Sequence, residues 1–415
     1  MFKKIISLLF ISFLVFVFLL SFNKKTSASE KPTWWTVQSV DTMKYSRDLS
    51  REKLDDPSFD DVIDKQVSQI AATGATHVAI ATPYDEEFYP ILKRWVVAAR
   101  AHHLKVWFRG NWSGWEEWFN YPKITRAEHI KKTEEFILKH KDIFEDGDVF
   151  TACPECENGG PGDPRMNGDV DGFRQFMIDE YKVTKTSFAK INKNVISNYD
   201  SMNGDVARLV MDKSTTQAMD GIVAVDHYVE TPDKLVGDLE QISQNSGGRI
   251  VLGEFGAPIP DINGDMTEDE QAAWIKSALS KLVDSPVVVG VNYWTNMGSS
   301  TSIWNDNGTP RKAVDALKSI YSAPVIEGVV VDEAGGGIPN AYVAVGNRTY
   351  ITDLGGHYAF SYFGENKTIT VSSQGYYNKQ VVMDQTKKQT IVLLSVKESF
   401  WFKVRKFIHN LVPFL

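Results

Sequence analysis

The sequence predicts an α/β protein that consists of a (β/α)8 TIM barrel followed by a small all-β sandwich domain. The first observation is that eight short apolar runs alternate with longer amphipathic stretches between Trp34 and about Tyr321, a span that suits this barrel. The second is a switch after Pro324 to period-two alternation with Gly, Asn and Asp turns, which is typical of antiparallel strands. With 43% hydrophobic residues in a chain of 415, both domains can form cores.

Each apolar run is short enough for a strand, and the amphipathic stretches have helical periodicity. The near-continuous Val residues of 287–291 suit a parallel strand that is buried on both faces. A doubly wound open sheet is the alternative, but no glycine-rich phosphate turn follows the first strand. The expected strands are residues 34–40, 76–82, 104–110, 148–155, 194–200, 221–228, 249–255 and 287–294, and the clearest helices are 60–74, 89–103, 129–144 and 269–283.

Residues 1–31 are expected to be a signal peptide or an N-terminal membrane anchor with a linker. Lys3 and Lys4 precede an unbroken apolar run from Ile5 to Phe22. This run is long for a signal sequence and just long enough for a membrane helix. Both interpretations export the rest of the chain, in which residues 32–323 are the barrel domain.

The C-terminal part contains small, apolar and turn residues at a defined spacing, namely Ile326, Gly328, Val330, Asp332, Gly337, Pro339, Ala341, Val343, Thr352, Asp353 and the stretch 356–360. This spacing resembles the carboxypeptidase regulatory-like family. The resemblance implies that residues 324–395 are a β-sandwich that serves secreted proteins as an accessory module without chemistry of its own. Residues 396–415 are expected to be a basic amphipathic helix, which lies on a membrane surface or packs on a neighbouring domain.

Polar residues follow most of the expected barrel strands. Active sites of (β/α)8 barrels lie at the carboxyl ends of the strands, and two of these ends, the fourth and the seventh, carry glutamates. We expect these glutamates to form a paired-carboxylate site. The candidate residues are Arg109 after the third strand, Glu155 and Glu157 after the fourth, Asn198 at the fifth, His227 and Tyr228 at the sixth, Glu254 at the seventh and Trp294 at the eighth.

Glutamates after strands four and seven resemble the clan of retaining glycoside hydrolases built on the (β/α)8 barrel, of which family 5 is the best-known member. The stretch Leu252-Gly-Glu-Phe-Gly256 is similar to the clan's nucleophile strand. Asn292-Tyr-Trp294 is similar to the strand whose Trp lines a sugar subsite. The resemblance implies that Glu254 is the nucleophile and that a second carboxyl is the acid/base.

The acid/base is expected to be Glu155. Aligning Pro154-Glu155-Cys156 with the clan's Asn-Glu-Pro keeps Phe150 five residues upstream, where an apolar core residue is expected. Glu157 is the alternative, through the stretch Cys-Glu-Asn-Gly. In either alignment the clan's Asn is replaced, by Pro154 without a donor or by Cys156 with a weak one. This departure leaves open a barrel that binds glycans without cleaving them.

The remaining candidates have two interpretations each. Trp112 and Trp115 in the loop after the third strand are expected to stack on sugar rings, unless they pack beneath the loop. Arg109 is expected to support the nucleophile or bind a sugar hydroxyl, with a structural ion pair as the other interpretation. His227 and Tyr228 are adjacent, and neighbouring strand residues face opposite sides, so only one is expected to reach the site.

Cys153 and Cys156 are the two cysteines of the chain. A redox pair would belong at a helix N-terminus, and a structural zinc would need two more ligands. A disulfide that braces the loop around Glu155 and a reduced pair at the barrel rim both remain open. No metal site and no bound cofactor are expected.

The sequence therefore predicts an exported glycoside hydrolase that cleaves β-glycosidic bonds of a poly- or oligosaccharide by a retaining two-glutamate mechanism. The alternative is a non-catalytic cell-surface glycan-binding protein on a degenerate hydrolase barrel. The expected location is extracellular or at the cell surface, and the expected partners are a carbohydrate and a membrane surface. A net charge of −8 argues against nucleic acid, which would require a basic face.

Overall fold

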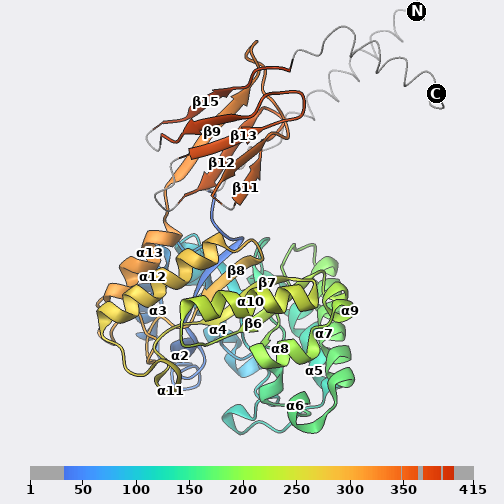
Figure 1. Ribbon diagram of the computed structural model, residues 1–415. Helices are drawn as coiled ribbons and strands as arrows, with labels where there is room; N and C mark the ends of the chain where they lie inside the picture. The colour runs from blue at the N-terminus through green and yellow to red at the C-terminus, as the bar shows by residue number, and fades with distance from the viewer. Residues whose placement is uncertain (1–31, 347, 363–367, 385–386, 397–415) are drawn as a thin grey trace, which may run out of the picture. The chain divides into compact units, whose positions relative to one another are not determined.

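A computed structural model describes residues 32–346, 348–362, 368–384 and 387–396 (Figure 1). Eight parallel strands form one sheet in the order β4-β3-β2-β1-β8-β7-β6-β5. An isolated parallel bridge joins Val149, at one edge of this sheet, to Ile196 in the segment that leads into the strand at the other edge, so the strands curl into a ring. The predicted (β/α)8 barrel is confirmed.

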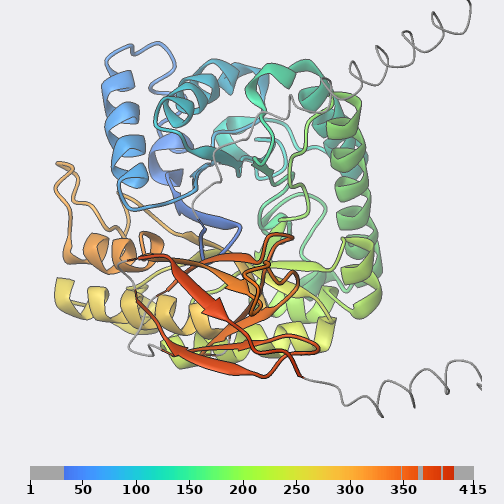
Figure 2. The ribbon, with the colours of Figure 1, turned by 90° about the horizontal axis from the view of Figure 1, so that it is seen from above.

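The barrel elements alternate along the chain as expected, and Figure 2 shows the helices as an outer ring around the strands. The strands are β1 (Val37–Asp41), β2 (His77–Ile80), β3 (Lys105–Phe108), β4 (Val149–Phe150), β5 (Ser201–Asn203), β6 (Ile222–Asp226), β7 (Arg249–Phe255) and β8 (Val288–Tyr293). The helices are α2 (Met43–Ser46), α3 (Phe59–Ala71), α4 (Tyr89–Ala101), α5 (Arg126–Lys139), α6 (Pro164–Asn167), α7 (Val170–Lys190), α8 (Gly204–Val210), α9 (Lys213–Ala218), α10 (Pro232–Ser246), α11 (Pro260–Asn263), α12 (Glu268–Asp284) and α13 (Lys312–Tyr321).

The fifth strand differs from the sequence prediction. Residues 194–200 were expected to form it, but β5 begins at Ser201, and the earlier segment contributes the single bridge of Ile196. The side chain of Asp200 takes over part of the link to the fourth strand, since its Oδ1 accepts the Ala152 N–H at 2.8 Å. A side chain thus substitutes for backbone pairing where the ring closes.

Apolar side chains form two clusters in the barrel. The larger cluster combines strand and helix residues and fills the space between the sheet and the helices. The smaller cluster fills the inside of the ring with residues of the strands and with Tyr199 from the segment before β5. Its buried members are Val37, Ala79, Trp107, Val149, Tyr199, Ile222, Ala224 and Val251.

The C-terminal strands form two sheets, in the orders β11-β10-β13-β14 and β12-β9-β15, around a core of their own. Their bounds are β9 (Val325–Val331), β10 (Tyr342–Val345), β11 (Arg348–Ile351), β12 (His357–Ser361), β13 (Thr368–Ser372), β14 (Lys379–Val382) and β15 (Gln389–Val392). The pairs are antiparallel except β9 and β15, which run parallel. Membership of the carboxypeptidase regulatory-like family, and the boundary between residues 323 and 324, stay predictions.

Within the described ranges, every helix is too short or too polar to cross a bilayer. The expected signal or anchor segment, residues 1–31, lies outside those ranges. The expected amphipathic segment does so too, apart from Val396.

Candidate active site

Period-two alternation carries polar residues to the inner face of the ring at the carboxyl ends of the strands. Val37 and Ala224 belong to the inner cluster. Asp41 lies four residues after Val37, and Asp226 lies two residues after Ala224. Arg109 follows the inner residue Trp107 by two positions. Since side chains two apart share a face of a strand, these charged groups point into the barrel.

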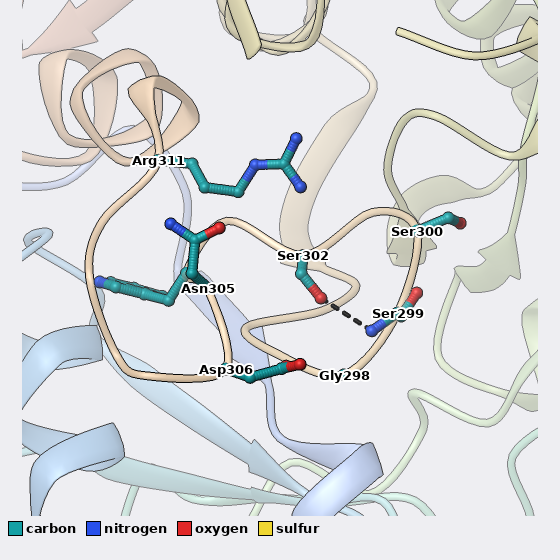
Figure 3. A pocket seen from close by; sticks show the side chains of 8 residues that line it. Gly298, Ser299, Ser300, Ser302, Asn305, Asp306 and Arg311 are labelled. Carbon is teal, nitrogen blue, oxygen red and sulfur yellow. Dashed lines mark hydrogen bonds between the residues drawn. The ribbon is translucent and has the colours of Figure 1, made fainter. Parts of the chain in front are cut away.

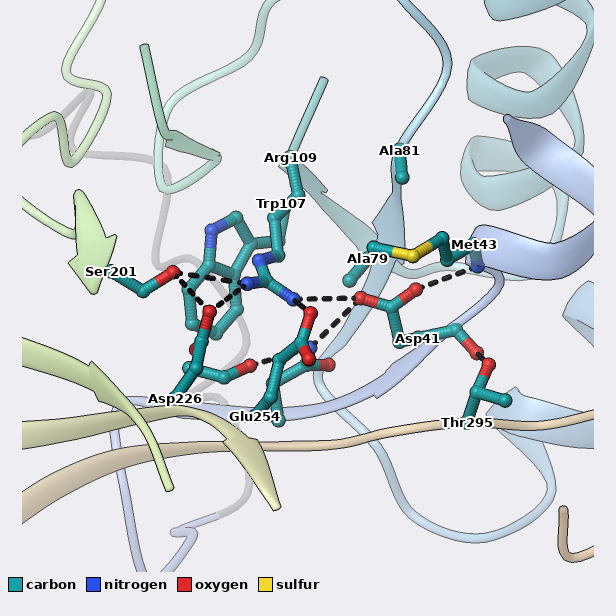
Figure 4. A network of polar contacts seen from close by, with 12 residues as sticks. Asp41, Met43, Ala79, Ala81, Trp107, Arg109, Ser201, Asp226, Glu254 and Thr295 are labelled. Carbon is teal, nitrogen blue, oxygen red and sulfur yellow. Dashed lines mark hydrogen bonds and ion pairs between the residues drawn. The ribbon is translucent and has the colours of Figure 1, made fainter. Parts of the chain in front are cut away.

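Arg109 is the centre of the resulting network (Figure 4). It is 1% exposed. Its Nη1 donates to Oε1 of Glu254 at 2.8 Å and to Oδ2 of Asp41 at 3.0 Å. Its Nη2 donates to Oδ2 of Asp226 and to Oγ of Ser201, both at 3.0 Å. One guanidinium therefore serves three carboxyl groups, a structural and electrostatic role that includes the support of Glu254 expected from the sequence.

A β-bulge turns Glu254 into the ring. Simple alternation from Val251 would point residue 254 outward, toward the helices. The register shifts along the β6–β7 pair. Val225 pairs with Leu252, but the next residue, Asp226, pairs with Glu254. Gly253 is the extra residue of this bulge, and the bulge re-aims the glutamate.

Glu254 is held by two donors and is 6% exposed. Besides the Arg109 guanidinium, the hydroxyl of Tyr228 donates to its Oε2 at 2.7 Å. A guanidinium and a phenol bonded to opposite oxygens stabilise a carboxylate anion and fix its orientation. Glu254 is thus arranged as a nucleophile would need to be.

Glu155 has an unusual backbone. Its φ of 46° lies in the left-handed region, which is uncommon for residues other than glycine and often marks functional sites. Its N–H donates to the carbonyl of Ser201 at 2.7 Å, which ties the turn after β4 to β5. Asn158 Nδ2 donates to Oε2 of the half-buried carboxyl at 3.0 Å.

The pKa of Glu155 lies well above its usual range. Burial of the carboxyl is the largest cause, followed by the negative charges of Glu254, Asp226 and Glu157, while Arg109 acts in the opposite direction. A carboxyl that stays protonated beside a carboxylate that accepts strong hydrogen bonds is the division of roles that acid/base catalysis needs.

Glu157 occupies a different environment. It is 3% exposed, and its Oε1 accepts the backbone N–H of Asn203 at 2.6 Å and the side-chain amide of Asn203 at 3.0 Å. Burial also raises the pKa of this carboxyl. These bonds anchor Glu157 to the end of β5, so its contacts are those of a bracing residue.

Cys153 and Cys156 form a disulfide on either side of Glu155. Asn111 Nδ2 lies 3.6 Å from the Cys153 sulfur, and Trp115 Nε1 donates to the Cys156 carbonyl at 3.1 Å. The loop after β3 therefore supports the turn that carries Glu155.

Of the two adjacent candidates directly after β6, Tyr228 reaches the site and the side chain of His227 does not. The Nε2 of His227 lies 2.8 Å from Oδ2 of Asp238 on α10, away from Glu254. Burial lowers the pKa of His227 against the opposing effect of Asp238. The structure therefore turns Tyr228 toward Glu254 and His227 toward α10.

Trp294 lies beside Tyr228, the residue that donates to Glu254. Its ring stands edge-on to Tyr228, with the centroids 6.2 Å apart and an interplanar angle of 81°. The Lys44 ammonium lies 5.7 Å from the Trp294 ring centroid. The indole is half-buried, and its Nε1 has no hydrogen-bond partner in the described part of the chain. This position is compatible with a sugar-stacking role.

Trp112 and Trp115 are core residues, which corrects their assignment to a sugar platform. They are 4% and 1% exposed. Trp112 packs against Tyr84 and Phe136, and Trp115 stacks on Phe176 at 5.0 Å. Because both rings are almost fully buried, they have no free face for a sugar ring.

Asn198 is also placed away from the network. Its Nδ2 donates to the Met219 carbonyl at 3.0 Å, and the fifth strand begins at Ser201, three residues after Asn198. Ser201 occupies the corresponding place in the site. Ser201, Asp41 and Asp226 were not predicted as site residues, although counting in steps of two along strands one and six identifies the two aspartates as inward-facing.

The loop after β8 encloses a polar hollow of about 440 Å³ (Figure 3). Ser302 Oγ accepts the Ser299 N–H at 2.8 Å on one wall. Gly298 lies against Lys44, the residue whose ammonium lies over Trp294. The lining residues are Gly298, Ser299, Ser300, Ser302, Trp304, Asn305, Asp306 and Arg311, which suit a polyhydroxylated ligand. No cluster of three or more His, Cys, Asp or Glu in the described ranges could hold a metal ion.

A solved structure supports the fold. A GH5_18 variant from Bifidobacterium longum subsp. longum, in complex with Manβ1-4GlcNAc, shares 13% identity with this chain at a TM-score of 0.52. The match covers 74% of this chain and 86% of the other. At such identity the likeness establishes the barrel fold.

Two larger proteins have lower structural similarity to this chain. Bacteroides uniformis β-glucuronidase 3 shares 12% identity at a TM-score of 0.44, with 80% of this chain and 47% of that one covered. Ruminococcus gnavus β-glucuronidase shares 12% at the same TM-score, with 63% and 46% covered. The chain spans about half the length of these two proteins, and their TM-scores are too low to establish a shared fold. No protein-family model and no curated protein matches the sequence.

Proposed function

We propose that the protein is a glycoside hydrolase that cleaves β-glycosidic bonds with retention of configuration. The observation that carries the proposal is the contrast between two carboxyl groups at the same end of the barrel. Glu254 accepts hydrogen bonds from Arg109 and Tyr228, and its charge contributes to the raised pKa of Glu155. Retaining hydrolysis requires such a pair, with one carboxylate and one carboxylic acid.

In the first step, Glu254 attacks the anomeric carbon while Glu155 gives its proton to the departing glycosidic oxygen. An ester then joins Glu254 to the sugar, and Glu155 is left as a carboxylate. In the second step, Glu155 takes a proton from water, and the resulting hydroxide displaces Glu254 from the sugar. Both carboxyls return to their initial states.

The neighbouring residues support these roles. Arg109 and Tyr228 orient Glu254 before attack, and Trp294 offers an apolar face beside it for the sugar ring. The polar hollow after β8 adds hydrogen-bonding groups for a further unit of a β-linked glucan, mannan or related polymer. The Manβ1-4GlcNAc bound by the GH5_18 variant makes β-mannosides the first substrates to test.

The decisive experiment is trapping with a panel of activated 2-deoxy-2-fluoro β-glycosides, followed by peptide mass mapping. A covalent sugar on the peptide that contains Glu254, absent from the Glu254→Gln variant, is the expected result. A label on another carboxyl would overturn the assignment of the nucleophile. Glycan binding without any label or turnover would favour the glycan-binding alternative, which the absence of a donor at Pro154 motivates.

We also propose that the protein is exported and associated with a membrane surface. The apolar run from Ile5 to Phe22 and the basic amphipathic pattern of residues 396–415 support this location. Fractionation of the producing cells, with N-terminal sequencing of the product, tests it. Recovery of the full-length chain in the cytosolic fraction would contradict the proposal.

A further inference from the structure

The network around Arg109 contains more acidic groups than its cation can neutralise. Asp41, Asp226 and Glu254 all accept hydrogen bonds from the one guanidinium. Asp41 and Asp226 are 0% and 2% exposed. If all three carboxyls were ionised, the cluster would carry two uncompensated negative charges, which is unfavourable in a buried site.

The hydrogen bonds distinguish the two aspartates. In Asp41, Oδ1 accepts the Met43 N–H at 2.6 Å, while Oδ2 accepts from Arg109 and from Asn292 Nδ2 at 3.1 Å. Both oxygens therefore have donors, as an anion requires. In Asp226, Oδ2 accepts from Arg109 and from the Ser201 hydroxyl at 2.8 Å. Its buried Oδ1 has no partner within the described residues.

Among the described residues, no cation donates a hydrogen bond to Oδ1 of Asp226. A Cβ built on Gly253 would lie 2.5 Å from this oxygen, so the bulge glycine provides the space that Oδ1 occupies. Arg109 from β3 and Ser201 from β5 face the other oxygen, while Glu254 from β7 and Glu157 after β4 add negative charge nearby. Burial raises the pKa of Asp226 well above its usual range, Arg109 opposes this effect, and Glu254 and Glu157 reinforce it.

We propose that Asp226 is a positioning residue that stays a neutral carboxylic acid with its proton on Oδ1. Its Oδ2 orients Arg109 as an acceptor and leaves the positive charge of the guanidinium to Asp41 and Glu254. Leaving one buried oxygen without a partner costs less free energy for a neutral acid than for an anion, which agrees with an unpaired Oδ1 beside an Oδ2 that accepts two bonds.

This inference rests on the proposed function in one respect, the pH behaviour of Glu155. A charged Asp226 is one of the causes that raise the pKa of Glu155, and a neutral Asp226 removes this contribution while burial and the charge of Glu254 remain. Glu155 must lose its proton in the first half of the reaction and act as a base in the second. A neutral Asp226 keeps the acid/base able to alternate between these states.

The variants Asp226→Asn and Asp41→Asn form a matched pair. Asparagine reproduces the acceptor and the neutrality of a protonated aspartic acid. Asp226→Asn is therefore expected to lower kcat/KM less than about tenfold. It should also leave unchanged the pH at which kcat/KM falls on the alkaline side of the pH profile, the alkaline limb. Asp41→Asn removes a charge and is expected to lower kcat/KM about 100-fold. An equal loss in both variants, or an alkaline limb moved to lower pH in Asp226→Asn, would overturn the proposal.

Infrared difference spectroscopy tests the proton without relying on turnover. At neutral pH, Asp226→Asn should lose one component of the carbonyl absorption of protonated carboxylic acids, while the component from Glu155 remains, and Asp41→Asn should lose none. If Asp226→Asn does not fold, the smaller Asp226→Ser takes its place. A spectrum that loses a carboxylate band instead would show that Asp226 is charged. An inactive protein that nevertheless shows the expected loss would refute the proposed function and retain this inference.

Discussion

Glu155 and Glu157 are two residues apart, yet the fold gives their carboxyl groups different surroundings. The left-handed backbone of Glu155 and the charge of Glu254 distinguish it from Glu157, whose Oε1 accepts two hydrogen bonds from Asn203. At the scale of single residues, conformation and partners decide which glutamate suits acid/base chemistry.

Replacing each glutamate by glutamine separates the two roles. We expect Glu155→Gln to lower kcat on a substrate with a poor leaving group about 100- to 10,000-fold, because general acid help is lost. Glu157→Gln, the matched control, is expected to retain kcat within about tenfold, since an amide oxygen can still accept from Asn203. Steady-state kinetics with an alkyl and a dinitrophenyl glycoside measure both effects. A larger loss of kcat in Glu157→Gln than in Glu155→Gln would identify Glu157 as the acid/base.

The raised pKa of Glu155 predicts the pH profile. The acid must be protonated to assist the leaving group, and because burial raises its pKa, the protonated form persists to higher pH. Activity should therefore fall as the pH rises through the pKa of Glu155 in the folded enzyme. Glu155→Gln, assayed with a dinitrophenyl glycoside that needs no acid, should lack this alkaline limb. A limb that remains would assign it to another group.

The bulge in β7 is the element that creates the site. Gly253 allows Glu254 to turn inward, and a Cβ there would lie 2.5 Å from Asp226 Oδ1 and 2.8 Å from Ser201 Cβ. A strand without the bulge would direct Glu254 toward the helices. The short β5 and the disulfide turn after β4 complete the same end of the barrel.

Gly253→Ala is expected to displace Asp226 and Ser201 and to lower kcat/KM at least about 100-fold, because the donors of the network lose their geometry. Gly237→Ala in α10 is the control, since nothing lies within 4 Å of its added Cβ. This variant should keep activity and gain about 0.5–1 kcal/mol of unfolding free energy. Circular dichroism and kinetics on both variants check the prediction. Full activity in Gly253→Ala would show that the network tolerates the shift.

At the scale of the whole molecule, chemistry and accessory structure are separate. Every residue of the Arg109 network, and Glu155 and Trp294 as well, belongs to the barrel. The C-terminal sheets enclose a distinct hydrophobic core. The catalytic proposal therefore depends on the barrel alone.

A chain that ends at residue 323 tests this separation. With the barrel core intact, we expect kcat/KM on a small soluble glycoside to stay within about twofold of the full chain. The truncated and full-length chains should differ in their binding to membranes or to a polymeric glycan. A large loss of kcat on the small substrate would assign the sandwich a part in the reaction.

The sequence by itself determined the barrel, the all-β sandwich and the positions of Glu155 and Glu254 at strand ends, because hydrophobic periodicity and chain order are local properties. Arg109 and Tyr228 could be predicted as site residues in the same way. Each of these inferences needs only the residues near one point in the chain.

The tertiary structure decided which candidates meet. Trp112 and Trp115 are buried, and His227 faces Asp238. Ser201, and not Asn198, contacts Arg109 in the site. The tertiary structure also brought Asp41 and Asp226 onto Arg109 from strands far apart in the chain. A bulge, a late-starting strand and a shared cation are consequences of strand register and ring closure, and these depend on contacts between distant residues that local patterns do not encode.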